Sequence, residues 1–220
     1  MKILALELSA AQGSLAWIDD VSRTDAIGEY KFNASSLLTW PNDRKDSGPF
    51  FDNVQQVVRQ FGLPERIIVG LGPGSYAGVR IAISTGIGLQ AAAGAELVGY
   101  PSVCAMEEPT DNYAVIGDAR RRSFFLVTVS NRNVVGDYEL HDESEMRKRL
   151  AKISTSTPII SSDPLPQFQP SVVQRFPSAE VLARIAVDTD GPFSTPPLEP
   201  IYLREANVTI PKPIFGRAKS

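Results

Sequence analysis

The sequence is poor in the residues on which most catalytic and metal sites depend. Its 220 residues include one histidine, His141, and one cysteine, Cys104. A structural zinc site takes about four cysteine or histidine ligands, and an intramolecular disulfide takes two cysteines, so the sequence excludes both. A Ser-His-Asp or Cys-His mechanism would have to use His141, which has no nucleophile near it in the sequence, so we expect this residue to be exposed and non-catalytic. Cys104 is expected to be a small buried apolar residue.

The chain also lacks a strong net charge and a long hydrophobic run. Acidic residues number 25 and basic residues 22, giving a formal net charge of −3, so no overall basic field indicates a nucleic-acid-binding protein. Glu7 interrupts the apolar opening, which leaves it too short for the hydrophobic region of a signal peptide. The fifteen residues between Arg80 and Glu96 are uncharged, but this stretch is too short and too polar to span a membrane. We therefore expect a cytoplasmic protein without a membrane segment.

What is present is a regular alternation of short apolar runs and helical patterns. The clearest helix repeats apolar residues about every 3.6 positions, with Pro49 in its first turn and Gly62 at its end. Its apolar positions are Phe50, Phe51, Val54, Val57, Val58 and Phe61. A second helix is expected from about Gly78 to Gly94. The strands predicted in this half are 3–8, 14–19, 28–33, 66–70 and 96–99.

The same order of elements restarts after residue 102. Strands are predicted at 113–117, 123–130, 133–140 and 158–162, and a charged helix is predicted at 142–152 before the last of them. The sequence therefore predicts an α/β fold with a duplicated β-β-β-α-β-α order, divided into 1–102 and 103–220. The last third is rich in proline and is expected to hold one further helix, 179–187.

The most distinctive segment is a glycine-rich turn, Leu71–Arg80, between a predicted strand and a predicted helix. Three residues separate Gly74 from Gly78 and no Gly-Lys-Ser/Thr follows, so the turn is neither the dinucleotide fingerprint nor a Walker A loop. Two interpretations stay open. The backbone N–H groups at the start of the helix could hold an anion, or the glycines serve a tight turn that leaves no room for a Cβ atom.

Small residues continue along the helix behind this turn. Gly78, Ala82, Gly86, Gln90 and Gly94 recur every four residues. A glycine inside a helix costs about 1 kcal/mol relative to alanine, so the stripe indicates the close approach of another backbone. That backbone belongs either to the chain's own sheet or to a partner's helix, and the spacing favours neither.

Each half has an acidic residue close to the end of its first predicted strand: Glu7 lies near the end of the first, and Asp118 directly follows the other. In duplicated folds of the actin and sugar-kinase type, carboxylates at these places flank a nucleotide and its Mg²⁺, so ATP with Mg²⁺ is a possible ligand between the two halves. Neither residue precedes the phosphate-binding hairpin of such sites, and the alternative is a pair of solvated carboxylates. The adjacent cluster 120–122 of three arginines could meet phosphate or an acidic partner, or form solvated surface.

Four blocks of sequence resemble the bacterial TsaB (YeaZ) family, in family order from residue 3 to residue 204. Residues 3–9, Ile-Leu-Ala-Leu-Glu-Leu-Ser, resemble the opening of the family's sequences. Two further short blocks that resemble the family are Asp118-Ala119-Arg120 and the segment 200–204, Pro-Ile-Tyr-Leu-Arg. The most specific block is the glycine signature, whose characteristic residues here are Gly72, Pro73, Gly74, Ser75, Gly78 and Arg80.

This resemblance implies an actin-like, sugar-kinase-like (ASKHA) fold of two lobes, 1–102 and 103–220. It implies a non-catalytic subunit that binds and activates its metal-carrying paralogue TsaD (Gcp) in the synthesis of N6-threonylcarbamoyladenosine (t6A) in tRNA. The ATPase TsaE is an implied partner, tRNA is met only through the complex, and the chain alone can pair with itself. The implied interface helices are 48–61 and 78–94. Their implied contact residues are Phe50, Val54, Val57, Gly78, Ala82, Gly86 and Gln90.

The sequence departs from the family at two places. Glu7 stands where the family has Asp, and Asp46 replaces the histidine of the family's Arg-x-His-Ser/Thr motif. One alternative function is a small-molecule kinase or ATPase that uses Glu7 and Asp118 around Mg-ATP. Another is a peptidase, which has no support because the sequence lacks both the paralogue's His-x-x-x-His metal motif and a nucleophile–base pair. We expect no catalytic residues and no bound metal.

Overall fold

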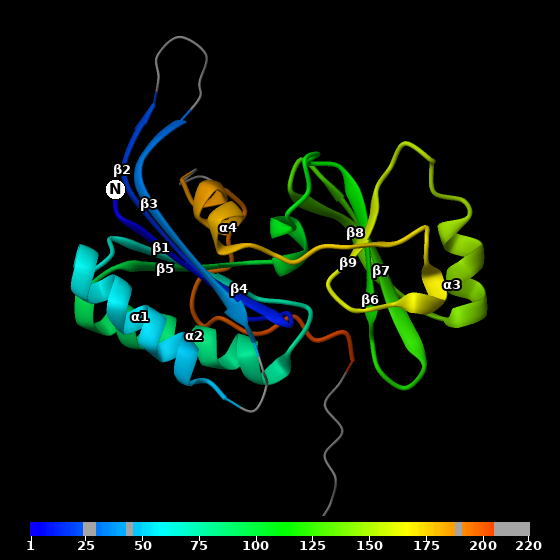
Figure 1. Cartoon of the computed structure of the whole chain (residues 1–220), viewed down its shortest axis with the longest axis horizontal. Coiled ribbons are helices and arrows are strands. Elements are labelled where there is room, and N and C mark those ends of the chain that lie inside the picture. Colours follow the sequence, from blue (N-terminus) through cyan, green and yellow to red (C-terminus); the bar gives the residue numbers. More distant parts are fainter. Residues whose placement is uncertain (24–29, 43–45, 188–190, 205–220) are drawn as a thin grey trace, which may run out of the picture.

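The computed structural model describes residues 1–23, 30–42, 46–187 and 191–204, and the chain forms two lobes side by side (Figure 1). The first lobe is built on a five-stranded sheet with the order β3-β2-β1-β4-β5. Its strands are β1 (Ile3–Glu7), β2 (Gln12–Arg23), β3 (Tyr30–Pro41), β4 (Arg66–Gly70) and β5 (Glu96–Tyr100). Every residue of β1 and β4 is buried, which is typical of strands covered on both faces of a sheet.

The second lobe repeats this topology. Its sheet has the order β10-β9-β6-β7-β8, so in both lobes the first strand lies in the middle, antiparallel to the second and parallel to the fourth. The strands are β6 (Tyr113–Asp118), β7 (Ser123–Ser130), β8 (Asn133–Asp142), β9 (Ile159–Ser161) and β10 (Val173–Gln174). The duplication predicted from the sequence is confirmed. The 3₁₀ turn η2 (Pro166–Phe168) stands where the first lobe has its second helix.

Helices cover both faces of the first sheet (Figure 1). On one face lie α1 (Gly48–Phe61) and α2 (Tyr76–Ala93). On the other face lies α4 (Ala179–Ile185), which belongs to the last third of the sequence but packs against β1, β2 and β4. The helix α3 (Glu143–Leu150) packs on β7 and β8 of the second lobe. The last third therefore returns to the first lobe, a long-range contact that local sequence patterns do not reveal.

A buried arginine helps to hold α4 in place. Arg66 is 1% exposed, and its guanidinium donates to the carbonyl of Ala186 at 3.0 Å. It also forms an ion pair with Glu96 at 3.4 Å and lies over the ring of Phe193. These contacts join β4 and β5 to the chain that follows α4, so they tie the sheet to the C-terminal third.

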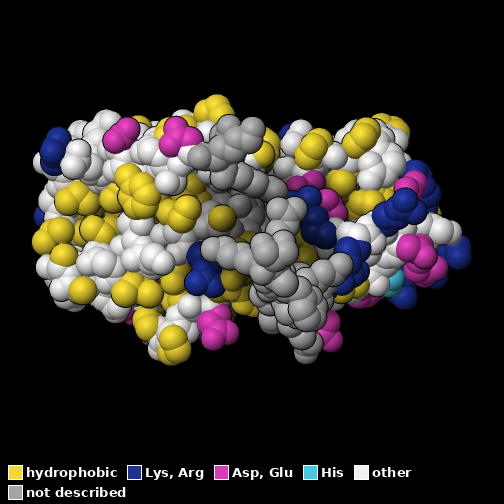
Figure 2. All heavy atoms as spheres, turned by 90° about the horizontal axis from the view of Figure 1, so that it is seen from below, with side chains coloured by type: hydrophobic (Ala, Val, Ile, Leu, Met, Phe, Trp, Pro, Cys, Tyr) yellow, Lys and Arg dark blue, Asp and Glu magenta, His cyan; other side chains and the backbone are white. Residues whose placement is uncertain are grey.

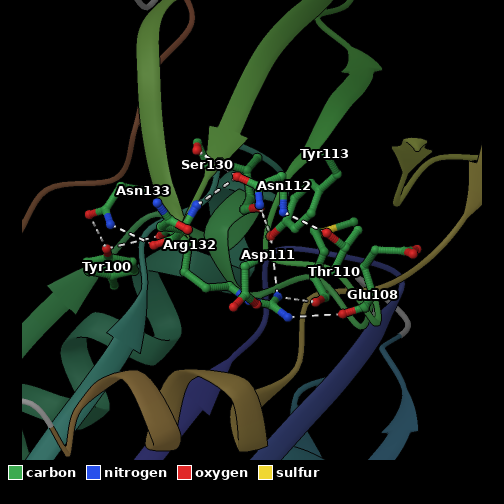
Figure 3. Close-up of polar contacts among 12 residues, drawn as sticks. Tyr100, Glu108, Thr110, Asp111, Asn112, Tyr113, Ser130, Arg132 and Asn133 are labelled. Atoms are coloured by element: carbon green, nitrogen blue, oxygen red, sulfur yellow. Dashed lines mark hydrogen bonds and ion pairs between the residues drawn. The ribbon is translucent and has the colours of Figure 1, made fainter. Parts of the chain in front are cut away.

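A second arginine ties the hairpin between β7 and β8 to the connection between the lobes (Figure 3). Arg132 donates to the carbonyl oxygens of Met106 and Glu108 at 2.7 and 3.0 Å, and to the carboxylate of Asp111 at 2.5 Å. These three acceptors lie between the 3₁₀ turn η1 (Ser102–Ala105) and β6. The connection is therefore fixed to the second lobe by one planar, charged side chain.

Most predicted elements occur at the expected places, with two differences. The strand predicted at 28–33 is β3, which runs on to Pro41 because it pairs with β2 along that whole length; residues 28 and 29 lie outside the described residues. On the apolar face predicted for α1, Phe50, Val54 and Val57 are buried, Val58 and Phe61 are partly buried, and Phe51 is 49% exposed. Cys104 is fully buried as predicted, and burial raises the pKa of its thiol to about 12.

Candidate functional site: the helical face and the cleft between the lobes

The glycine-rich turn is shaped by its contact with the end of β1. A Cβ atom on Gly74 would lie 2.2 Å from the carbonyl oxygen of Ser9, and one on Gly78 would lie 2.1 Å from that of Leu8. Gly72 has a φ of +86°, a conformation that glycine adopts without strain. Ser75 caps α2 by accepting a hydrogen bond from the N–H of Gly78. The tight-turn interpretation of the glycines therefore accounts for all three of them.

The small-residue stripe of α2 faces the chain's own sheet. Ala82 and Gly86 are buried, and a Cβ atom on Gly86 would lie 3.0 Å from a methyl carbon of Leu97 on β5. Of the implied interface residues, six are buried within this lobe and therefore do not reach the solvent-facing side of the helices: Phe50, Val54, Val57, Gly78, Ala82 and Gly86. Only Gln90 is partly exposed. The helices remain the predicted interface, but other residues form their outer surface.

That outer surface carries an apolar groove, which we call the helical groove. It is an open hollow of about 550 Å³ along α2 and beside α1. Its lining residues are Phe51, Arg80, Ile81, Ser84, Thr85, Gly88 and Leu89. Phe51 is 49% exposed, and Ile87, which precedes Gly88 on α2, is 48% exposed. Figure 2 shows hydrophobic side chains gathered on this side of the molecule. Large apolar side chains exposed in a group are typical of a surface that another protein covers.

Glu7 lies beneath the glycine turn and is fully buried. One carboxylate oxygen accepts a hydrogen bond from the N–H of Ser9 at 2.6 Å, and among the described residues the other has no hydrogen-bond partner. That second oxygen lies where a Cβ atom on Gly70 would be. Burial raises the pKa of the Glu7 carboxyl, and the nearby hydroxyls of Ser9 and Ser102 oppose this only in part. Glu7 is thus an internal group, and the cavity between the lobes does not include it in its lining.

Replacing this buried acid should make the free energy of unfolding less dependent on pH. Glu7 ionises near pH 4.5 in the unfolded chain and at a higher pH in the folded one. The folded state therefore binds more protons, and the free energy of unfolding falls as pH rises above about 4.5. At a pH above both pKa values, each unit by which the folded pKa exceeds the unfolded one lowers the free energy of unfolding by about 1.4 kcal/mol. Glu7→Gln should remove this loss, so urea denaturation should show a larger stability advantage of the variant at pH 8 than at pH 4.5. An advantage that does not change with pH would contradict the assignment.

Asp118 lies at the cleft, where its carboxylate is already engaged. It accepts hydrogen bonds from the backbone N–H of Arg120 at 2.7 Å and from the guanidinium of the same residue at 3.1 Å. The backbone N–H of Asp118 donates to Asp163 at 2.8 Å. Asp118 and Glu7 are therefore not brought together as a pair of carboxylates facing one ligand, and the arrangement does not fit the Mg²⁺–nucleotide site that the fold analogy suggests. Among the described residues no three His, Cys, Asp or Glu side chains are grouped closely enough to hold a metal ion.

The cleft itself is a cavity of about 270 Å³ between the lobes. Its walls come from segments far apart in the sequence, namely 9–11, 71–79, 118–120, 162–164 and 200–204. All four blocks on which the family resemblance rests contribute to it. The C-terminal block reaches the cleft because the N–H of Ile201 donates to the carbonyl of Leu71 and because Leu198 is buried in the first lobe.

A cation and two aromatic rings stand at the edge of this cleft. The rings of Tyr76 and Tyr202 are 5.6 Å apart, and both residues are about half exposed. Arg80 lies over Tyr76 and donates to its hydroxyl at 2.7 Å. The sequence alone does not single out these tyrosines as a pair, since the 125 positions between them hide their contact.

Two lobes with the same strand order, joined at a cleft, define the actin-like, sugar-kinase-like class of fold. Two solved structures share this arrangement over nearly the whole chain. A Pseudomonas aeruginosa protein described as uncharacterized and similar to peptidase YeaZ is 18% identical, with a TM-score of 0.68 over 92% of this chain and 99% of that one. YeaZ from Pseudomonas aeruginosa is 17% identical, with a TM-score of 0.65 over the same shares. No family model matches the sequence, and no curated protein matches it.

No helix among the described residues is long and apolar enough to cross a membrane.

Proposed function

We propose that the chain is a TsaB (YeaZ)-type accessory subunit that binds and activates the TsaD paralogue in t6A synthesis on tRNA. The observation that carries the proposal is the helical groove, an exposed apolar surface on the two helices through which the family is implied to bind its partner. The convergence of the four resemblance blocks on one cleft supports the family assignment, as does the fold shared with YeaZ. The kinase alternative is weakened by the burial of Glu7.

The partner surface consists of the outward-facing residues of α1 and α2. Phe51 and Ile87 are the large exposed apolar side chains that a partner would cover, and Gly88 lines the groove. Apolar area of this kind contributes roughly 25 cal/mol for every Å² that association removes from water. In the absence of TsaD a second copy of the chain would cover the same groove. TsaE joins the complex, and ATP or Mg²⁺ enters through these partners.

Filling the groove should block this association. A Cβ atom on Gly88 would meet no atom within 4 Å, so Gly88→Leu adds a side chain to the groove without disturbing the fold. Binding to the TsaD of the same organism, measured by calorimetry, should weaken at least tenfold, which is about 1.4 kcal/mol. Ala151→Leu is the matched control, because it adds the same side chain at an exposed position on the second lobe. A folded Gly88→Leu protein with unchanged affinity would contradict the interface.

A further inference from the structure

We propose that the edge of the cleft binds a single strand of nucleic acid, with an unpaired base stacked at the tyrosine pair and phosphates along the neighbouring arginines. We call this surface the arginine edge. It comprises Tyr76, Arg80, Arg120, Arg121, Arg122, Tyr202 and Arg204. The inference goes beyond the proposed function, in which RNA is met only through the partners.

The positive charge of the arginine edge lies mainly outside the cavity. Within the cavity, Arg120 is paired with Asp118 at 3.1 Å. Arg121 and Arg122 follow in the turn between β6 and β7, are exposed, and among the described residues have no ion pair or hydrogen bond from their side chains. Figure 2 shows Lys and Arg side chains near the border between the lobes. Free guanidinium groups at this place are suited to phosphate oxygens.

Two further arginines of this surface keep their charge. Arg80 donates to the hydroxyl of Tyr76, and Arg204 donates to the hydroxyl of Ser123. Both acceptors are neutral, so neither contact cancels the charge of its guanidinium. Uncompensated cations therefore occur on three segments of this surface, namely α2, the turn after β6 and the end of the C-terminal block.

The position of the arginines favours one unit of a polymer over a whole small ligand, because Arg121 and Arg122 do not line the cavity. The cavity has about 270 Å³, near the lower limit of the pockets that enclose a drug-sized molecule, about 300–1,000 Å³. The arginines extend beyond it, so the ligand would be a chain of phosphates with only part of its length in the cleft. An acidic peptide would neutralise the charge of the arginines but would not stack on the two half-exposed tyrosine rings. Unpaired bases stack on such rings and on guanidinium planes.

Fluorescence anisotropy of the full chain with labelled single-stranded RNA tests this inference. Arg121→Gln/Arg122→Gln should weaken binding about tenfold and reduce the slope of log affinity against log salt by about 1.4, since each phosphate contact in a single strand contributes about 0.7. Tyr202→Leu should weaken binding about tenfold, as expected for a lost base stack, and should leave the salt slope unchanged. Arg59→Gln/Arg149→Gln, which removes the same charge from exposed sites on other elements, should change neither quantity.

A DNA strand of the same sequence and the two duplexes complete the experiment. Tighter binding of RNA than of DNA assigns the strand as RNA, and equal binding of the two supports a general single-strand site. The inference is overturned if neither strand binds, if the duplexes bind as tightly and Tyr202→Leu has no effect, or if polyglutamate displaces RNA as readily as RNA does. Because the chain is tested alone, none of these results depends on its association with TsaD.

Discussion

Gly78→Ala is expected to destabilise the protein by about 3 kcal/mol or more. The added Cβ atom would lie 2.1 Å from the carbonyl oxygen of Leu8 and 3.2 Å from its carbonyl carbon. Overpacking of a well-filled core costs about 1–3 kcal/mol, and here the obstacle is backbone. The end of β1 would have to move away from α2, and with it the residues that hold Glu7. The free energy of unfolding in urea, monitored by circular dichroism, measures the loss.

Gly88→Ala is the matched control on the same helix. No atom lies within 4 Å of a Cβ atom at Gly88, so this variant should gain up to about 1 kcal/mol from helix propensity. The two substitutions are chemically identical and differ only in what the new methyl group meets. Equal stabilities of the two variants would show that contact with Leu8 does not explain the glycine at position 78.

Arg132→Ala is the second change with a large expected effect, about 3 kcal/mol. The guanidinium donates to two carbonyl oxygens and one carboxylate of the connection between the lobes (Figure 3). It is also 5.7 Å from the centre of the Tyr113 ring. Hydrogen bonds to charged groups contribute about 1.5–3 kcal/mol each, and losing this donor leaves partly buried carbonyl groups without a partner. Arg132→Lys keeps the charge but not the planar fork, so it should recover only part of the loss.

Arg122→Ala is a control for the left-handed backbone conformation of Arg132. Both arginines have a φ of +60°, so both substitutions place alanine in the same left-handed conformation. Arg122 makes no side-chain contact of this kind among the described residues, and its replacement should change the free energy of unfolding by less than about 0.5 kcal/mol. A comparable loss in both variants would mean that the backbone conformation, and not the hydrogen bonds of Arg132, is responsible.

The sequence predicts the fold well because its strands and helices repeat in one order. The apolar runs that become β1, β4 and β6 are clear in a single sequence, since strands buried on both faces read as continuous apolar stretches. The packing of α4 on the first sheet could not be predicted. It depends on the fit of Ala179, Leu182 and Ala183 against that sheet, and such fit carries no local signature.

The candidate site was predicted only at the level of its elements. Spacing identified α2 as a helix with a small-residue stripe, but it could not say which backbone the stripe meets. The structure shows the sheet beneath Gly86, which leaves the groove around Gly88 on the outer side. Glu7 had the place of a nucleotide ligand at the end of β1, yet burial gives it an internal role. Burial depends on the whole fold and could not be read from position alone.

The central claim is that this chain supports the catalysis of a paralogue without performing it. The most direct measurement is t6A formation on tRNA by purified TsaC, TsaD and TsaE of the same organism, with and without the chain, quantified by nucleoside mass spectrometry. We predict sustained t6A formation only when the chain is present, and a loss of that effect with Gly88→Leu but not with Ala151→Leu. The same rate of t6A formation with and without the chain would contradict the account.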